Sequence, residues 1–355
     1  MLNSVLTAKR LLTRPSRRIR RGAVLLTAVV ASAALTAPSA VPAPADSTRA
    51  ESVRVLAWNI FHGGKNDGLG GEKNFALLLD QLADIAPDVF FSVETYGSAE
   101  EIRAALSERA GKGAYHAVRI TDAANDNLWV FTRYDVVTTF PNPTGTTVTD
   151  FNIGGARVRL PGGRQLNLFD TWTSYTEPWI GDMIDTNAKD VQAGRPPTYS
   201  PKQVADAEKG KQIPQVTDIV RKQVPRMLAG NTDPVLLAGD LNTIPAADWT
   251  DRWAGCAHHF GLGYDLAATD ILTDAGYTDT YRAAHPDVCA DPGRTWSPHP
   301  DYAGMVTKDR IDFVFAKGPQ IQVNDAHVID ERLPQHESGP FYSDHGAVVT
   351  ELTVR

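Results

Sequence analysis

Apolar residues follow two periods along the chain, and each period predicts a type of element. The runs at 54–58, 88–93 and 235–238 are short and largely apolar, as expected for buried strands. Between the first two runs, apolar side chains recur every three or four residues from Glu72 to Ile85, which predicts an amphipathic helix. Pro87 marks the end of that helix, because the residue before a proline disfavours the helical conformation.

The rest of the chain continues this mixture of strands and helices. The polar, proline-containing segment 174–200 is predicted as a long surface insertion, and 202–228 as helix with a break at Pro214. Residues 247–310 are expected to form loops and short helices. Further strands are predicted at 115–120, 128–132, 135–140, 156–160, 165–171, 310–316, 321–329 and 346–354, and a further helix at 99–109. Because several strands follow one another directly, the order predicts an α/β fold of two packed sheets with outer helices.

The first 45 residues have the features of a secretory signal peptide. They carry seven basic groups and no acid, and the basic groups precede an apolar stretch with small residues. That stretch is about 16 residues, shorter than the roughly 20 of a membrane span, although a retained membrane anchor is the alternative. Ala43–Ala45 offers a cleavage site, which predicts a signal peptide over 1–45 and a mature domain over 46–355. Ser16–Arg18 leaves both Sec and twin-arginine export open.

Removal of this segment leaves a strongly acidic chain. The whole sequence has a formal charge of −7, and loss of the seven basic groups takes it to −14. Affinity for nucleic acid draws on Lys and Arg at the phosphates, so charge alone predicts no stable nucleic-acid complex. A nuclease whose metal neutralises the phosphate locally remains compatible with this charge. After processing, no membrane association is expected, and the oligomeric state is left open.

The chain has two cysteines, Cys256 and Cys289. In an exported protein such a pair favours a disulfide, and two separate buried thiols are the alternative. Neither cysteine has the CxxC spacing typical of a zinc site. The sequence therefore predicts one disulfide that closes a loop in the second half of the chain.

Polar residues that can carry chemistry stand at or beside the ends of predicted strands. They are Asn59, Glu94, Asp240, Asn242, Asp312, Asp344 and His345. The segments GDLN, RID and SDH, in this order after a strand-end Asn and Glu, resemble the endonuclease/exonuclease/phosphatase superfamily of deoxyribonuclease-like, metal-dependent phosphoesterases. The resemblance covers roughly residues 53–354. It implies a four-layer α/β sandwich, with two packed mixed β-sheets flanked by helices.

The resemblance also implies roles for these residues. A phosphoester repels hydroxide, and a hard cation on oxygen ligands neutralises that charge; Mg²⁺ is the expected metal, with Mn²⁺ or Ca²⁺ as alternatives. Glu94 would be the principal metal ligand, with Asn59 beside it and Asp344 completing the shell. Asp240 would orient or deprotonate the attacking water, and Asn242 would hold a phosphate oxygen. His345 would donate to the phosphoryl oxygens, and Asp312 would fix its tautomer.

One segment departs from the family pattern. Where related proteins place a second histidine after the middle strand, this chain reads LFDTWTSY, and Trp172 occupies the position. An indole has one donor and no titratable proton, so it cannot replace a charged clamp. Trp172, Trp296 and Arg282 are predicted as substrate contacts, the aromatic rings by stacking and the arginine by its charge. Packing within the core or a loop is the alternative for the aromatic residues.

Three functions are compatible with these features. The first is an exported, divalent-metal-dependent hydrolase that cleaves phosphoester bonds, chiefly phosphodiesters, of extracellular substrates. The second is a secreted nuclease acting on DNA or RNA, which a basic groove would favour. The third is a non-catalytic binding module that retains the fold, which loss of the metal ligands would favour. Every predicted ligand is present in the sequence, and this supports an enzyme.

Overall fold

The computed structural model describes residues 49–355, and the predicted signal peptide over 1–45 lies outside them. In the described residues no helix has both the length and the apolarity needed to cross a membrane. The helices are α1 (Glu72–Ile85), α2 (Ala99–Arg109), α3 (Ile180–Gln192), α4 (Pro201–Ala207), α5 (Gln212–Asp218), α6 (Val224–Leu228), α7 (Asp270–Asp274) and α8 (Thr280–Ala284). The strands are β1 (Glu51–Asn59), β2 (Val89–Val93), β3 (His116–Arg119), β4 (Trp129–Thr132), β5 (Asp135–Thr139), β6 (Ile153–Arg159), β7 (Gln165–Trp172), β8 (Val235–Asp240), β9 (Thr278–Asp279), β10 (Asp312–Lys317), β11 (Ile321–Ile329) and β12 (Ala347–Val354).

The strands form two six-stranded mixed sheets. Sheet A has the order β11-β12-β1-β2-β4-β3, and sheet B has the order β5-β6-β7-β8-β10-β9. In sheet A, β1 runs parallel to β2 and antiparallel to β12. In sheet B, β8 runs parallel to β7 and antiparallel to β10. Each sheet therefore has one central strand whose carboxyl end meets the ends of two neighbours.

Apolar side chains of both sheets meet in one buried cluster. Val55 of β1 and Phe91 of β2 belong to the same cluster as Leu168 of β7, Leu236 of β8 and Val314 of β10. These side chains are fully or almost fully buried, and complete burial of one of this size contributes about 1.5–3 kcal/mol relative to exposure. The two sheets are thus packed face to face over a common core.

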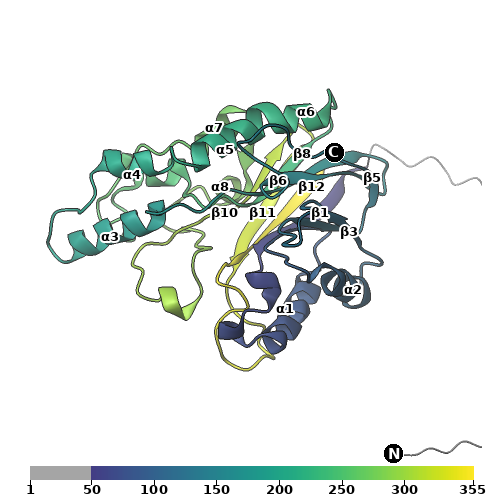
Figure 1. Cartoon of the computed structure of the whole chain (residues 1–355), viewed down its shortest axis with the longest axis horizontal. Helices are drawn as coiled ribbons and strands as arrows, with labels where there is room; N and C mark the ends of the chain where they lie inside the picture. Colours follow the sequence, from purple (N-terminus) through teal and green to yellow (C-terminus); the bar gives the residue numbers. More distant parts are fainter. Residues whose placement is uncertain (1–48) are drawn as a thin grey trace, which may run out of the picture. The chain divides into compact units, whose positions relative to one another are not determined.

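Helices cover the outer faces of both sheets (Figure 1). On sheet A, Leu82 of α1 and Ile102 of α2 pack in one cluster with Phe90. On sheet B, Val216 of α5 packs in one cluster with Phe315. The predicted four-layer α/β sandwich, with two mixed sheets flanked by helices, is confirmed.

The segment 174–200 differs from its prediction as a surface insertion. Its central part forms α3, whose apolar residues Ile180, Met183 and Ile184 are buried in a cluster with Trp249 of the loop region after β8. The helical spacing of these residues is interrupted by aspartates and an asparagine, so it is weak in the sequence. The carboxylate of the buried Asp185 accepts hydrogen bonds from the backbone N–H groups of residues 306 and 307, so the prediction of a surface insertion was wrong for this part of the segment.

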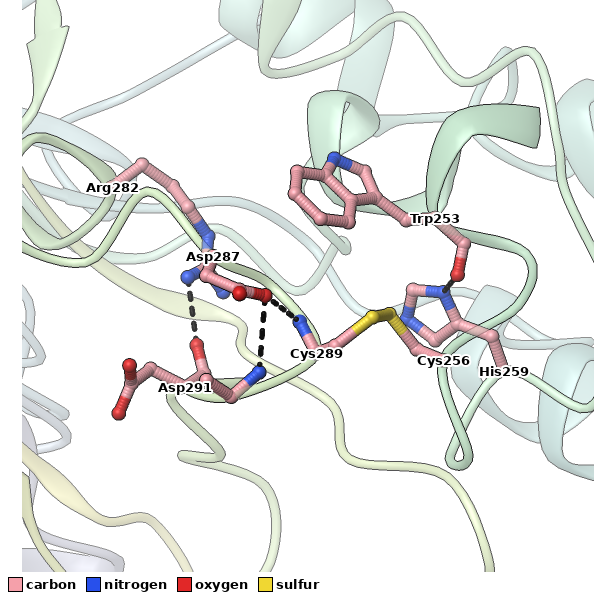
Figure 2. The surroundings of a disulfide bond; sticks show 8 residues. Trp253, Cys256, His259, Arg282, Asp287, Cys289 and Asp291 are labelled. Carbon is pink, nitrogen blue, oxygen red and sulfur yellow. Dashed lines mark hydrogen bonds between the residues drawn. A yellow bond between two sulfur atoms is a disulfide. The ribbon is translucent and has the colours of Figure 1, made fainter.

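Cys256 and Cys289 form the predicted disulfide (Figure 2). Their Cα atoms lie 5.0 Å apart and 33 positions separate them in the sequence. On either side of the bond the backbone is held locally, because Asp287 accepts from the N–H of Cys289 and the ring of His259 pairs with the carbonyl of Trp253. The bond therefore closes the irregular region between β8 and β10.

Loss of this disulfide is expected to destabilise the chain. A closed loop of this length constrains the unfolded state by about 3–4 kcal/mol in the chain-entropy model. We expect Cys256→Ser combined with Cys289→Ser to lower the free energy of unfolding by that amount, as measured by urea denaturation. Reductant should lower the urea midpoint of the unaltered chain and leave that of the double variant unchanged. Equal midpoints for the oxidised chain and the double variant would contradict the expectation.

Candidate active site

The topology of sheet A brings four of the predicted site residues to one edge. Asn59 ends β1 and lies in register with Val93 of the parallel strand β2, so Glu94 follows directly beside it. Asp344 and His345 precede β12, which runs antiparallel to β1, and they reach the same edge. Residues far apart in the sequence meet here because the carboxyl ends of β1 and β2 and the start of β12 coincide.

Sheet B supplies the opposite side of the site. Asp240 is the last residue of β8, and it lies in register with Asp312, the first residue of the antiparallel strand β10. On its other side Asp240 lies in register with Trp172, the last residue of the parallel strand β7. The two sheets therefore place their functional edges together.

Asn59 joins the carboxylates of the two sheets. Its Nδ2 atom lies 3.2 Å from Oε1 of Glu94 and 3.2 Å from Oδ2 of Asp240, and donates to both. The other oxygen of Glu94 accepts from the backbone N–H of His62 at 3.0 Å. The side-chain oxygen of Asn59 accepts from the N–H of Phe61 at 3.0 Å. The segment after β1 thus orients Asn59 and Glu94, two of the three predicted metal ligands.

Glu94 and Asp344 stand at the same edge of sheet A, where their carboxylate oxygens could serve as ligands of a cation. Burial raises the pKa of Asp344 to about 6; His345 opposes the rise, and the nearby Glu94 adds to it. A hard divalent cation between these carboxylates would offset the cost of ionising Asp344. The donor set at this edge therefore fits the predicted metal.

His345 and Asp312 form the predicted pair. Nδ1 of His345 lies 2.9 Å from Oδ2 of Asp312, and both side chains are buried. Burial alone would lower the pKa of His345, but Asp312 and Asp240 outweigh it and raise the pKa to about 10. The imidazole is therefore protonated at neutral pH, and its Nε2 is left as a donor 3.9 Å from both Asp240 Oδ2 and Asp344 Oδ1.

One atom each of Asp240, Asp312 and His345 lies within 4.8 Å of the others, a spacing that could also hold a cation. The hydrogen bond between His345 and Asp312 also suits the three residues to handling protons, so the same trio could hold a cation or pass a proton. A second trio, formed by Cys256, His258 and His259, is excluded as a metal site because the cysteine is in the disulfide.

Asp240 lies at the centre of the site. Its Oδ1 accepts from the N–H of Asn242 at 2.8 Å. Burial raises the pKa of Asp240 to about 7, although the charge of His345 lowers it. A carboxyl group with a pKa near neutrality can exchange a proton at working pH, which suits the predicted work on the attacking water.

Asn242 orients Asp240 and has less freedom than predicted. Its Nδ2 donates to the carbonyl of Thr173 at 2.8 Å and to Oδ2 of Asp240 at 3.3 Å. The backbone carbonyl of Asn242 accepts from the indole of Trp179 and from the side-chain amide of Gln212. Both amide hydrogens thus have acceptors within the fold, so a bond to a phosphate oxygen would have to replace the longer contact.

Two site residues have backbone conformations that non-glycine residues rarely adopt. The φ angles of Glu94 and Asn242 are 57° and 45°, both in the left-handed region. Such strain persists only where surrounding contacts enforce it, and it is common at functional sites. Here the N–H of Glu94 is held by Asn127 and the N–H of Asn242 by Asp240.

The predicted substrate contacts fall in different places. Trp172 lies at the correct strand end, and its half-buried ring packs edge-on against Phe151 at 5.5 Å. Trp296 lies at the site itself, with its ring centroid 4.8 Å from that of His345. Arg282 was predicted as an anion contact, and this was wrong. Its guanidinium donates to the carboxylate of Asp248 and to the carbonyls of residues 285, 291 and 292, which engages its donors within the fold.

Several supporting residues were missed from the sequence. The hydroxyl of Ser343 donates to the carbonyl of Asn59 at 2.7 Å and accepts from the N–H of His345 at 3.1 Å. The indole of Trp58 donates to the carbonyl of His345 at 2.9 Å. Ser343 is the first residue of SDH and could have been assigned from that motif. Trp58 reads only as a core residue in the sequence.

Comparisons with known proteins agree with this fold. A family model described as Endonuclease/Exonuclease/phosphatase family matches residues 56–345. An uncharacterized protein of Caenorhabditis elegans is 24% identical over 316 residues, which cover 85% of this chain and 91% of that protein. Two solved structures share the fold. Truncated TDP2 of Caenorhabditis elegans has a TM-score of 0.54 and 15% identity, over 85% of this chain and 97% of that one.

The second solved structure is a mannosyl-6-phosphatase of Bacteroides thetaiotaomicron. It has a TM-score of 0.55 and 14% identity, over 84% of this chain and 99% of that one. At these identities the two structures show a common fold. The family model spans most of the chain and both sheets of the site. The chain therefore belongs to the endonuclease/exonuclease/phosphatase family and is a metal-dependent phosphoesterase.

Proposed function

We propose that this phosphoesterase is exported and hydrolyses extracellular phosphodiesters with Mg²⁺ as its metal. The observation that carries the proposal is the meeting of Asn59 and Glu94 with Asp240 and the His345–Asp312 pair at one edge of two sheets. Carboxylate and amide oxygens are the ligands that Mg²⁺ prefers. Mn²⁺ and Ca²⁺ are the other candidates.

Glu94 and Asp344 would hold the cation, with Asn59 beside them. When bound there, the cation would neutralise negative charge on the phosphoryl oxygens. The oxygens of Glu94 already accept from Asn59 and from the N–H of His62, so the carboxylate is oriented before any ligand arrives. Orientation by neighbouring donors increases the precision of such a site.

The remaining groups would manage protons and charge. Asp240, with a pKa of about 7, would accept a proton from the attacking water. His345 would donate through Nε2 to a phosphoryl oxygen as negative charge develops, while Asp312 holds Nδ1. Family relatives use a second histidine for the phosphate, and here Trp172 occupies that strand end, so the charged imidazole of His345 would carry more of the task.

A substrate panel tests the proposal. Mature chain with Mg²⁺, Mn²⁺ or Ca²⁺ would be assayed with bis(p-nitrophenyl) phosphate, p-nitrophenyl phosphate, plasmid DNA and RNA. We expect metal-dependent turnover, with the diester favoured over the monoester and over both nucleic acids. Preference for DNA or RNA would support the nuclease instead. Metal binding without turnover of any phosphoester would support a non-catalytic module.

The proposed export leads to a separate prediction about the amino terminus of the mature protein. The basic start, the short apolar stretch and Ala43–Ala45 predict cleavage and release from the cell. Mass spectrometry of the extracellular protein should find an amino terminus near Asp46. Recovery of the intact chain in the membrane fraction, with none in the medium, would contradict export by cleavage.

A further inference from the structure

Four aromatic side chains form a continuous group that begins at the catalytic histidine. The ring of Trp296 lies 4.8 Å from that of His345, and Tyr302 lies 4.6 Å beyond Trp296. A second branch runs from Trp296 to Trp179 at 5.8 Å and from Trp179 to Tyr175 at 6.2 Å. We call Tyr175, Trp179, Trp296 and Tyr302 the aromatic patch. It links His345 to solvent by two routes.

The outer members of the patch are exposed. Among the described residues, the large hydrophobic side chains that are exposed are Tyr175 at 47%, Tyr302 at 37% and Val137 at 39%. Val137 lies on the edge strand β5 apart from the two tyrosines, and a single exposed apolar side chain of this kind is ordinary on a protein surface. The two tyrosines come from different segments, yet both lie in the patch that starts at His345.

Packing explains the inner members of the patch but not the outer ones. Trp179 is buried in the cluster around α3, and its indole donates to the carbonyl of Asn242. Trp296 is half-buried against the same cluster. For Tyr175 and Tyr302, the described residues offer no hydrogen bond to either hydroxyl, and neither ring belongs to a buried cluster. Their rings are therefore available to a ligand.

We propose that the aromatic patch binds the organic group of the substrate, and that this group is an aromatic ring attached to the phosphate. Aromatic side chains bind flat rings by stacking, and such stacking tolerates many ring types. The inference rests on the proposed phosphodiesterase function and names its substrate class. Tyr175 and Tyr302 are the residues that determine this specificity.

Kinetics with paired variants test the inference. The variant Tyr175→Ala combined with Tyr302→Ala should raise KM for bis(p-nitrophenyl) phosphate by about tenfold, the size expected for loss of aromatic stacking, with kcat little changed. Tyr175→Phe combined with Tyr302→Phe keeps both rings and should retain the original KM. Val137→Ala, the exposed control, should also leave KM unchanged. Circular dichroism melting would verify that each variant is folded.

The outcomes separate this inference from the proposed function. If the double alanine variant keeps the original KM while metal-dependent turnover persists, the patch is not a substrate subsite and the proposed function stands. If neither the unaltered chain nor any of the variants hydrolyses a diester, the proposed function itself is wrong. Competition provides a second test: phenyl phosphate should inhibit at lower concentration than methyl phosphate at equal salt. Equal inhibition by the two compounds would overturn binding of an aromatic ring by the patch.

Discussion

Replacing His345 with alanine is expected to lower kcat by at least about 100-fold, the effect typical of losing a positioned proton donor. The physical reason is the charge on the ring. Asp312, 2.9 Å from Nδ1, and Asp240 raise the pKa of His345 to about 10 in spite of its burial, so the ring is a cation at neutral pH. A fixed cationic donor stabilises the charge that spreads over the phosphoryl oxygens in the transition state. Steady-state kinetics with bis(p-nitrophenyl) phosphate would measure the loss.

A weaker effect is expected for Asp312→Asn, because the histidine remains while its tautomer and charge are less well enforced. A matched control is available in His327 and Asp325, an exposed histidine–aspartate pair on β11 with ring and carboxylate 3.7 Å apart. His327→Ala should leave kcat unchanged. Equal kcat values for His345→Ala and the unaltered chain would remove His345 from the mechanism.

Glu94→Gln is expected to weaken metal binding and turnover together. Residues that only support a metal ligand typically contribute 10–100-fold to affinity or activity, so a direct ligand should contribute at least about tenfold. The amide keeps the size of the side chain and removes the charge that faces Asp344. Isothermal titration calorimetry with Mg²⁺ would give the affinity, and initial rates would give the activity.

The control for Glu94→Gln is Glu101→Gln. Glu101 is on α2 and pairs with Lys65 at the surface, 3.0 Å between the charged atoms. Its loss should leave both metal affinity and rate unchanged. If Glu94→Gln bound Mg²⁺ as tightly as the unaltered chain, the assignment of Glu94 as a metal ligand would be wrong.

Local pattern was sufficient to predict most of the fold. The helix predicted over 72–85 has those bounds in α1, and the helix over 99–109 has those bounds in α2. The ends of several strands could also be predicted from the sequence. The pairing of Asp240 with Asp312 follows from the antiparallel register of β8 and β10. The reason is that periodicity and strand ends are local properties, while the sheets bring distant strand ends together by a small number of rules.

The sequence failed where tertiary partners decide the outcome. In α3 the buried Asp185 and Asn187 resemble surface residues, and only their partners, such as the backbone at 306–307 and the hydroxyl of Tyr264, show that they lie inside. In the sequence Arg282 resembles an anion contact, and only the structure shows that its guanidinium donates to the carboxylate of Asp248. The sequence shows that Asn242 has a side-chain amide able to donate to a phosphate. It does not show that this amide already donates to the carbonyl of Thr173 and the carboxylate of Asp240.

The most direct test is a Mg²⁺ titration of one preparation of the mature chain, freed of metal with EDTA, in which binding and turnover of bis(p-nitrophenyl) phosphate are both measured. A single cation held at the edge where Asn59 joins Glu94 and Asp240 predicts no turnover without metal. It also predicts that activity and binding reach half-saturation at the same Mg²⁺ concentration. Full turnover in the presence of excess EDTA would contradict a metal-dependent site.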